Sequence, residues 1–292
     1  MKDLFDGAAA EKVAWTARMI GRLDADVLAL QEVGSAEIVR LVLSHIAGCG
    51  YGEPVIGTAD ARGIRCALVS RRTVLASRVH TAESLAFPAF HAQDPPPFAG
   101  RIPLRRGIVH ARIDAGDIGP VEVMVAHFKS RRPVPLLGVD AGAEALARMT
   151  ARARAEAELR SLVWRAAEGL YLRGLVDECL ADPGARMCIT GDFNDVADSA
   201  TLMALRGDGG PGALSSCARG VPSEERYSIL HGGERAQIDH ILVTSNLAEH
   251  LTGARFFNEE LREHGEVAAG APEATDSDHA PFVAEFKRRS FS

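Results

Sequence analysis

The chain has few of the features that mark membrane, secreted or zinc-binding proteins. No apolar run approaches the roughly 18–20 residues that a membrane helix needs. The first residues, MKDLFDGAAAEK, contain no apolar signal-peptide core, so we expect no membrane segment and a cytoplasmic location. The five cysteines are an odd number without CxxC spacing, which disfavours a disulfide framework or a zinc site. We expect reduced, buried thiols at Cys49, Cys66, Cys179, Cys188 and Cys217.

Aromatic residues and net positive charge are also scarce. Aromatic side chains make up 5% of the chain, and the formal net charge is −6. Bulk electrostatics therefore do not hold this protein on nucleic acid, although an acidic enzyme can still bind one or two phosphates locally. Segments 90–106 and 206–235 carry no ladder of aromatic side chains, which favours a duplex backbone or a small phosphate over stacked single-stranded bases.

The remaining composition is that of an ordinary globular protein. The chain has 292 residues, of which 47% are hydrophobic and 25% charged, and it contains no internal repeat or low-complexity linker. This length permits one large domain or two of ordinary size. It also permits a sizeable core without disulfides or a structural metal.

Hydrophobic periodicity predicts an alternation of helices and strands. Apolar residues at helical spacing predict helices over residues 9–23 and, after a capping Ser35, up to Ile46. A longer segment, 141–180, is helical by propensity and is expected to break near Gly169 or Gly174. Several strands follow one another without room for a crossover helix, which predicts a mixed α/β fold with much antiparallel pairing. Short apolar runs predict these strands at residues 26–30, 65–70, 107–113, 121–127, 187–190, 238–244 and 281–286.

Acidic, histidine and amide side chains occur next to the ends of these predicted strands. Such residues often only begin a loop: His127 alone could be a hydrogen-bonded structural histidine, and Asp192 and Asn194 could form a turn after Gly191. The set is more informative than any member, because a buried sheet delivers strand-end side chains to one edge. Its members are Glu32, His127, Asp192, Asn194, Asp239, His240, Asp278 and His279.

The residue types in this set favour one kind of chemistry. Carboxylate oxygens suit Mg²⁺ or Mn²⁺, and the lack of clustered cysteine and histidine disfavours zinc. Phosphodiester hydrolysis requires a divalent ion to neutralise charge and a positioned base to orient water. A neutral histidine needs a partner to fix its tautomer, and Asp239 is the candidate partner for His279.

Six short motifs in order along the chain resemble the endonuclease/exonuclease/phosphatase superfamily, which includes pancreatic-type deoxyribonuclease and the abasic-site endonucleases. No single motif is specific, but six in this order are. They are ADVLALQEV (25–33), RCALVSR (65–71), VAHFKS (125–130), ITGDFND (189–195), IDHILVTS (238–245) and SDHAPF (277–282). Leu-Phe-Asp at 4–6, the HFKS form and Arg226-Tyr227-Ser228 look most like a bacterial nuclease-type subgroup.

The resemblance implies a divalent cofactor, Mg²⁺ or Mn²⁺, and the residues around it. Glu32 matches the family's magnesium-binding glutamate, and Asp278 matches a second metal ligand. His127 matches the histidine that contacts the scissile phosphate and stabilises developing charge. Asn194 matches the amide that positions the phosphate.

The resemblance also implies the groups that move protons. Asp192 matches the aspartate that orients or activates the attacking water. His279 matches the general base or transition-state stabiliser, and Asp239 matches the carboxylate that pairs with it. Which of Asp192 and His279 removes the proton stays open at this point.

Substrate binding is expected from basic residues. Residues 100–132 carry an excess of positive charge inside an acidic chain, and arginine binds phosphate in a bidentate manner. A solvated loop balanced by charges elsewhere is the alternative. The candidates for substrate binding are Arg105, Arg106, Lys129 and Arg131.

The N-terminus departs from the family pattern. The family's first strand carries a metal-binding asparagine in the pattern Asn, two residues, Asn-Leu-Phe-Asp, whereas this sequence begins MKDLFD and has no asparagine before Asn194. We expect either that the native start lies upstream of Met1 or that this is a short form with weakened metal binding. In both cases a neighbouring strand should have an unpaired edge beside an unfilled core.

The resemblance implies one domain over residues 1–292, a four-layer α/β/β/α sandwich with two mixed, largely antiparallel sheets. The leading hypothesis is a metal-dependent hydrolase of phosphodiester bonds in nucleic acid, acting through in-line attack of an activated water. One alternative is a phosphatase or phosphodiesterase for a small or lipid phosphate, because substrate choice resides in variable loops. The second alternative is a non-catalytic scaffold of the same fold. Nothing in the sequence points to an obligate protein partner.

Overall fold

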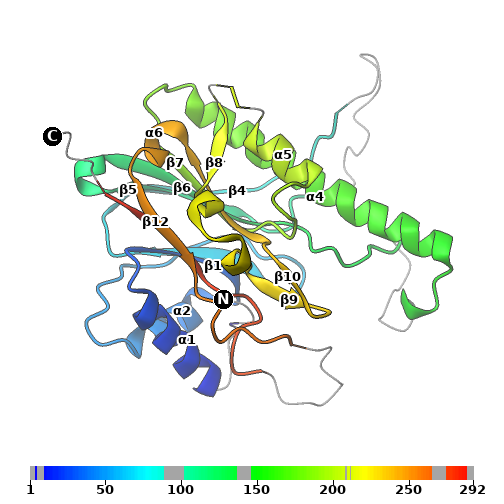
Figure 1. The fold of residues 1–292 in the computed structure, drawn as a ribbon, viewed down its shortest axis with the longest axis horizontal. Coiled ribbons are helices and arrows are strands. Elements are labelled where there is room, and N and C mark those ends of the chain that lie inside the picture. Colours follow the sequence, from blue (N-terminus) through cyan, green and yellow to red (C-terminus); the bar gives the residue numbers. More distant parts are fainter. Residues whose placement is uncertain are drawn as a thin grey trace.

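The computed structural model has a mixed α/β fold of strands between helices (Figure 1). No helix in the described part is both long and apolar enough to cross a membrane. All five cysteines are free thiols, as expected, but only Cys66 and Cys217 are buried and the other three are half-buried. The structure describes Leu4 and residues 10–88, 102–136, 146–207, 209–210, 212–264 and 274–287.

The largest sheet has six strands in the order β4–β5–β6–β7–β11–β8. Only the β6–β7 pair is parallel, and the other neighbours are antiparallel. The sheet is therefore mixed and largely antiparallel, as predicted. Its strands are β4 (Val74–His80), β5 (Ile108–Asp114), β6 (Pro120–His127), β7 (Met187–Asp192), β8 (Leu214–Ser216) and β11 (Asp239–Thr244).

The second layer of strands consists of two separate pieces. One piece has three strands in the order β1–β3–β2, and the other is the antiparallel pair β12–β13. A short hairpin, β9–β10, stands apart from both. The bounds are β1 (Val27–Val33), β2 (Val55–Ile56), β3 (Arg65–Ser70), β9 (Ile229–His231), β10 (Glu234–Ala236), β12 (Leu251–Phe256) and β13 (Phe282–Phe286).

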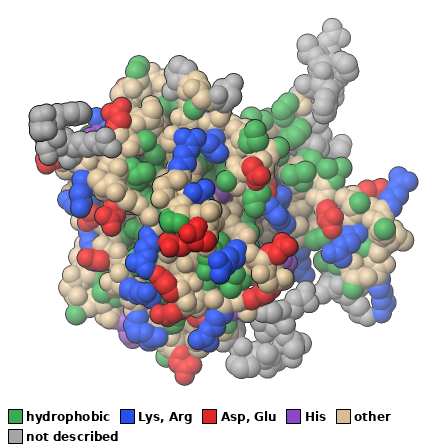
Figure 2. Space-filling model, in the orientation of Figure 1, with side chains coloured by type: hydrophobic (Ala, Val, Ile, Leu, Met, Phe, Trp, Pro, Cys, Tyr) green, Lys and Arg blue, Asp and Glu red, His purple; other side chains and the backbone are tan. Residues whose placement is uncertain are grey.

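Helices cover the outer sides of the strands. In Figure 1, α4 and α5 lie on one side of the molecule and α1 and α2 on the opposite side. Basic and acidic side chains are interspersed over the visible surface, including the projecting end of α4 (Figure 2). The helices are α1 (Ala10–Leu23), α2 (Ala36–Ser44), α4 (Ala151–Leu180), α5 (Ala200–Arg206) and α6 (Ser245–Ala248).

Alternating side chains of single strands divide the core. In β3, Ala67 and Val69 pack in the cluster with α1 and α2, whereas Cys66 and Leu68 pack against β5 and β6. In β6, Met124 packs in the cluster with α4 and α5. Successive side chains of a strand point to opposite faces, so each of these strands contributes to two cores. The sheets thus pack on each other through their inner faces and on helices through their outer faces.

Two helix predictions have different outcomes. Ser35 caps α2, because its hydroxyl accepts a hydrogen bond from the amide of Ile38 at 3.2 Å, as predicted. The predicted break in the long helix is wrong, since α4 continues through Gly169 and Gly174. A Cβ at Gly169 would lie 3.0 Å from the Thr201 methyl carbon, so this glycine lets α5 pack closely instead of ending the helix.

A cavity of about 480 Å³ separates the two pieces of the second layer. Consecutive residues of both facing strands line it, Val27–Gln31 of β1 and Phe282–Phe286 of β13. Lining by consecutive residues means that the strands face the cavity with their edges, where backbone groups lie. Leu4 forms a parallel bridge to Val33 at one end of this cavity-facing edge. Apart from that bridge, no strand of the described part lies between β1 and β13, so this edge of β1 pairs with no other described strand.

Gly191 is the glycine with the closest backbone contact in the described part. Any side chain at this position should therefore cause a large loss of stability. Its φ is +146°, and a Cβ there would lie 1.8 Å from the carbonyl oxygen of Ala126. We expect Gly191→Ala to lower the free energy of unfolding by about 4 kcal/mol through strain and overpacking. Urea unfolding measures this effect.

The matched control is Gly174→Ala, where nothing lies within 4 Å of an added Cβ. Alanine in this helix interior should raise stability by up to about 1 kcal/mol. Equal unfolding midpoints for the two variants would contradict the prediction.

Candidate active site

Three of the predicted site residues lie in one row across the six-stranded sheet. His127 ends β6 and is the register partner of Asp192, which ends β7. Asp239 begins β11 and pairs with Asp192 from the other side. Each residue stands at a strand end, so the row lies at one edge of the sheet, where loops can reach it.

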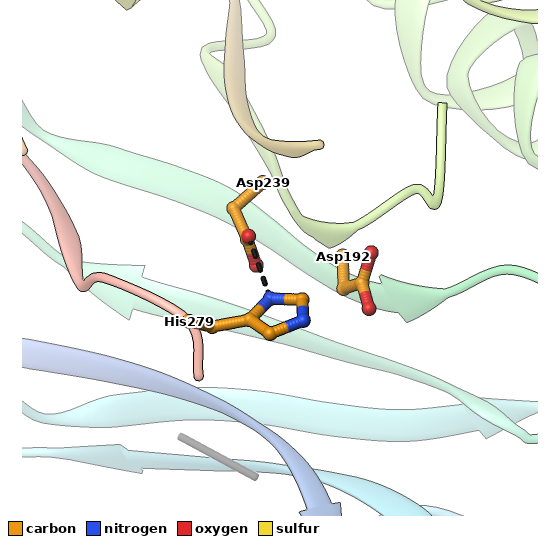
Figure 3. A group of neighbouring side chains, drawn as sticks. All are labelled: Asp192, Asp239 and His279. Atoms are coloured by element: carbon orange, nitrogen blue, oxygen red, sulfur yellow. Dashed lines mark hydrogen bonds and ion pairs between the residues drawn. The ribbon is translucent and has the colours of Figure 1, made fainter. Parts of the chain in front are cut away.

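His279, which precedes β13, completes this group (Figure 3). Its Nδ1 lies 2.8 Å from Oδ2 of Asp239, and its other ring nitrogen faces the side of Asp192. Burial lowers the pKa of His279, but the negative charges of Asp239, Asp192 and Asp278 outweigh it and raise the pKa to about 9. The pair therefore favours the protonated ring, with Asp239 fixing its orientation.

The pKa values of the two aspartates are shifted in opposite directions, although burial acts in the same direction on both. It raises the pKa of Asp192 to about 6, although the nearby His279 opposes the shift. Burial also disfavours the charged form of Asp239, but His279 holds the pKa of that carboxyl below its ordinary value. Two carboxylates in one row thus have different affinities for a proton, which is common at acid–base sites.

The same side chains could hold a metal ion. One potential ligand atom from each of Asp192, Asp239 and His279 lies within 4.8 Å of the others, and the described part contains no other such group. Carboxylate oxygens in this number suit a hard divalent cation such as Mg²⁺ or Mn²⁺. The residues present therefore fit the cofactor that the sequence implies.

Glu32 reaches this group through an irregularity in β1. The register of β1 against β3 shifts between Leu30 and Val33, and Glu32 has a φ of +54°. A bulge of this kind redirects a side chain, and a left-handed conformation is costly for glutamate. Oε1 of Glu32 lies 4.0 Å from Nε2 of His127, which in turn lies 3.4 Å from Oδ2 of Asp192.

Asn194 fixes the position of Asp192. Its backbone amide donates to Oδ1 of Asp192 at 2.8 Å, and its side-chain amide donates to Oδ2 at 3.1 Å. The same Nδ2 donates to the carbonyl of Phe128 at 3.0 Å. Asn194 also has a left-handed backbone, with φ +52°. Asp278 is half-buried and contributes negative charge to His279.

The four predicted substrate-binding cations differ in their surroundings. Arg106 is buried and donates to the carbonyls of His127 and Phe128 at 3.1 and 3.3 Å. Lys129 donates from Nζ to the carbonyls of Ser130 and Arg132 at 2.8 Å. These two cations therefore brace the segment after β6.

The other two predicted cations are more accessible. Arg105 keeps 24% of its side chain exposed and lies 3.8 Å from Asp60. Arg131 is 57% exposed and pairs with Asp195 at 2.8 Å. Both can therefore meet a solvent-borne ligand more readily than the buried pair.

Two further residues support the site and were not assigned a role from the sequence. Ser228 is fully buried, and its hydroxyl accepts hydrogen bonds from the amides of Ile238 and Asp239, both at 3.1 Å. Asp195 pairs with Arg165 at 3.0 Å, and its carbonyl lies 2.9 Å from Nε2 of His240. Ser228 belongs to the motif RYS and Asp195 to the motif GDFND. Only the contacts in the folded protein show which groups these two residues position.

Comparison with solved structures reveals the same fold in several phosphoester hydrolases. A mannosyl-6-phosphatase from Bacteroides thetaiotaomicron has a TM-score of 0.57 at 16% identity, over 95% of this chain and 91% of that one. A 3′ phosphatase from Neisseria bound to a product DNA hairpin has a TM-score of 0.53 at 17% identity, over 93% and 92%. An AP endonuclease from Archaeoglobus fulgidus has a TM-score of 0.53 at 16% identity, over 95% of each chain.

Sequence comparison identifies the family more directly. No curated protein matches this sequence. The sequence profile of the Endonuclease/Exonuclease/phosphatase family, however, matches residues 12–279, a range that includes Glu32 and ends at His279. The chain therefore belongs to the endonuclease/exonuclease/phosphatase family.

Proposed function

We propose that this protein is a divalent-metal-dependent hydrolase that cleaves phosphodiester bonds in nucleic acid. The observation that carries the proposal is the Asp239–His279 pair, 2.8 Å apart, beside Asp192 at one edge of the sheet. A histidine paired with a carboxylate next to a second, separately tuned carboxylate suits acid–base chemistry on water and a phosphoryl group. Structural relatives named as an AP endonuclease and a DNA-bound 3′ phosphatase support nucleic acid as the substrate.

In this proposal, the protein's own groups divide the work of an in-line attack. Asp192, pinned by Asn194, orients the water and accepts its proton. His279, oriented by Asp239, donates a hydrogen bond from Nε2 to the phosphoryl oxygen as negative charge develops. His127 contacts the same phosphate from β6.

Glu32 and Asp278 are the proposed protein ligands of a divalent ion, whereas Asp192, Asp239 and His279, which also offer potential ligand atoms, serve the proton-transfer steps in this proposal. Both are acidic and lie close to the row, one beside His127 and the other adjacent to His279. Such an ion, when bound, neutralises charge on the phosphate and on the leaving oxygen. The carboxylates of Glu32 and Asp278 would hold the ion next to the residues that transfer protons.

Metal removal tests the proposal directly. We expect cleavage of plasmid DNA and of bis-p-nitrophenyl phosphate with Mg²⁺ or Mn²⁺, and loss of both activities in EDTA. Asp192→Ala should abolish the same activities, because it removes the carboxylate that meets both His127 and Asn194. Metal-independent cleavage, or full activity in the variant, would contradict the assignment, and silence on every substrate would favour a non-catalytic scaffold.

A phosphomonoester substrate is the alternative favoured by the likeness to a mannosyl-6-phosphatase. Both reactions use the same phosphoryl chemistry, and loops decide which substrate enters. Hydrolysis of p-nitrophenyl phosphate and sugar phosphates without cleavage of plasmid DNA would replace the nucleic-acid assignment with this one.

Asp239→Asn is expected to lower kcat by about 10²–10⁴-fold while changing KM little. An amide retains the size of the carboxylate but not the charge that orients and stabilises a protonated His279. Steady-state kinetics on bis-p-nitrophenyl phosphate measure the effect. Asp117→Asn, at an exposed aspartate, is the control and should behave as the native protein. Native kcat in Asp239→Asn would remove the proposed role.

A further inference from the structure

A second cavity, of about 520 Å³, lies beside the candidate active site. The segment before β3, the segment before β5, the chain after β6 and one side chain of α4 form its wall. We call this cavity the arginine pocket and define it by Asp60, Arg62, Arg105, Lys129, Arg132 and Trp164. None of the proposed catalytic or metal-binding residues lines it.

The charge of the arginine pocket is strongly positive although the whole chain is acidic. Its described wall contains four cations, while Asp60 is the single carboxylate in that wall. Three arginines share the carboxylate of Asp60. Its Oδ2 lies 3.2 Å from a guanidinium nitrogen of Arg106, 3.5 Å from one of Arg62 and 3.8 Å from one of Arg105. One carboxylate cannot neutralise this many guanidinium groups, so the wall retains a positive excess.

The side chains of the pocket are held in position, but not all of their hydrogen-bond donors are used within the described part. The indole of Trp164 donates to the carbonyl of Pro103 at 3.1 Å, and its ring lies 5.5 Å from the Arg105 guanidinium carbon. In the described part, the guanidinium groups of Arg105 and Arg132 donate no hydrogen bond. Arginine donors held in a concave wall suit the oxygen atoms of phosphate.

Mutual repulsion in the wall also favours an anion. Burial and then the neighbouring Arg105 lower the pKa of Lys129 to about 8. Burial and then Arg106 lower the pKa of Arg105. A bound anion would offset this crowding of positive charge.

The pocket and the candidate active site share one segment of chain. Lys129 follows His127 by two residues, which places their Cα atoms within about 7 Å of each other. Arg106, next to Arg105, donates to the carbonyls of His127 and Phe128. The amide of Lys129 donates to the buried Glu168 at 2.6 Å, which fixes the segment against α4. A ligand in the pocket would therefore lie next to a phosphate held at His127.

We propose that the arginine pocket binds a second phosphate group of the substrate, on the nucleotide that adjoins the scissile phosphodiester bond. This inference rests on the nuclease function proposed above and specifies its substrate as a strand or nucleotide with phosphates on both sides of a sugar. Arg62, Arg105 and Arg132 supply the contacts.

A binding experiment without turnover tests the pocket by itself. The chain has two tryptophans, so Trp15→Phe leaves Trp164 as the single reporter of the pocket. Thymidine 3′,5′-bisphosphate, titrated in EDTA, should give a saturable change in Trp164 fluorescence, whereas thymidine should give none. Adding Arg62→Ala and Arg132→Ala should weaken binding about tenfold, the effect of losing one or two charge-assisted hydrogen bonds.

Both arginines are exposed, so these substitutions should not prevent folding, which the melting temperature checks. Arg152→Ala, at a side chain that is 90% exposed on α4, is the matched control and should bind as the parent. Equal binding by the double variant, or no saturable signal by fluorescence and by calorimetry, would overturn the proposal.

Kinetics on two dinucleotides link the pocket to the reaction. Native protein should hydrolyse a 5′-phosphorylated thymidine dinucleotide with kcat/KM about tenfold above that of the unphosphorylated dinucleotide. The double variant should lose this preference through KM. Equal kcat/KM for both substrates in the native protein would refute the subsite. Bisphosphate binding without hydrolysis of either dinucleotide would refute the nuclease function and retain the phosphate site.

Discussion

Replacing His279 with alanine is expected to lower kcat/KM for bis-p-nitrophenyl phosphate by about 10³-fold. The substitution removes the only ring that Asp239 orients in the described part, and with it the hydrogen bond proposed for the phosphoryl oxygen. Both kcat and kcat/KM should fall together, because the lost contact strengthens in the transition state. Steady-state kinetics with Mn²⁺ measure the effect.

The loss of His279 also leaves the buried charge of Asp239 without its cation, so stability needs a separate measurement. His279→Gln, which retains hydrogen bonding and much of the volume, should melt closer to the native temperature than His279→Ala and remain inactive. His45→Ala, at an exposed histidine, should leave activity unchanged. Activity within threefold of native in His279→Ala would refute the proposed role of the ring.

The second large effect is expected from filling the cavity between β1 and β13. A strand of alternating valine and polar residues attached ahead of Met1 should raise the melting temperature by about 5–10 °C, from a net gain of about 3 kcal/mol. Leu4 already bonds to the edge of β1, since its amide donates to the carbonyl of Glu32 at 3.0 Å. The added strand would continue parallel to β1 and pair its open edge.

A sequence control separates strand pairing from simple chain extension. A glycine/serine extension of equal length cannot fill the cavity and should leave the melting temperature unchanged. Amide hydrogen exchange in Val27–Gln31 and Phe282–Phe286 should slow only with the valine extension. Because Asp239 and His279 also line the cavity, activity should rise with stability when the strand carries an asparagine. Equal melting temperatures for both extensions would exclude strand insertion.

The regular strands of the large sheet could be predicted because their signals are local. The runs at 107–113, 121–127, 187–190 and 238–244 each correspond to a strand of that sheet. The edge strand β4 was missed, since VLASRVH is mostly exposed and carries no alternating pattern. The strand β12 was missed because LTGARF contains a glycine and a charge.

In the candidate site, too, some residues could be predicted from local sequence signals and others could not. Asp192, Asp239 and His279 were predicted as site residues from the sequence alone, because they lie next to the ends of predicted strands. Their meeting depends on register, because Asp239 and His279 are 40 residues apart and join through separate strands. The bulge that redirects Glu32 has no local sequence signal, and the buried role of Ser228 depends on the amides that face it.

The sequence by itself determined the family, four of the six strands of the large sheet and the chemical character of the residues at strand ends. The tertiary structure decided which of these side chains contact one another, that Arg106 and Lys129 brace the chain instead of facing solvent, and that a positive cavity adjoins the site. Hydrophobic periodicity and motif spacing act over a few residues. Hydrogen-bond donors, by contrast, are satisfied by whichever acceptors the strand register brings within 3 Å or so, and that register is set by the whole core.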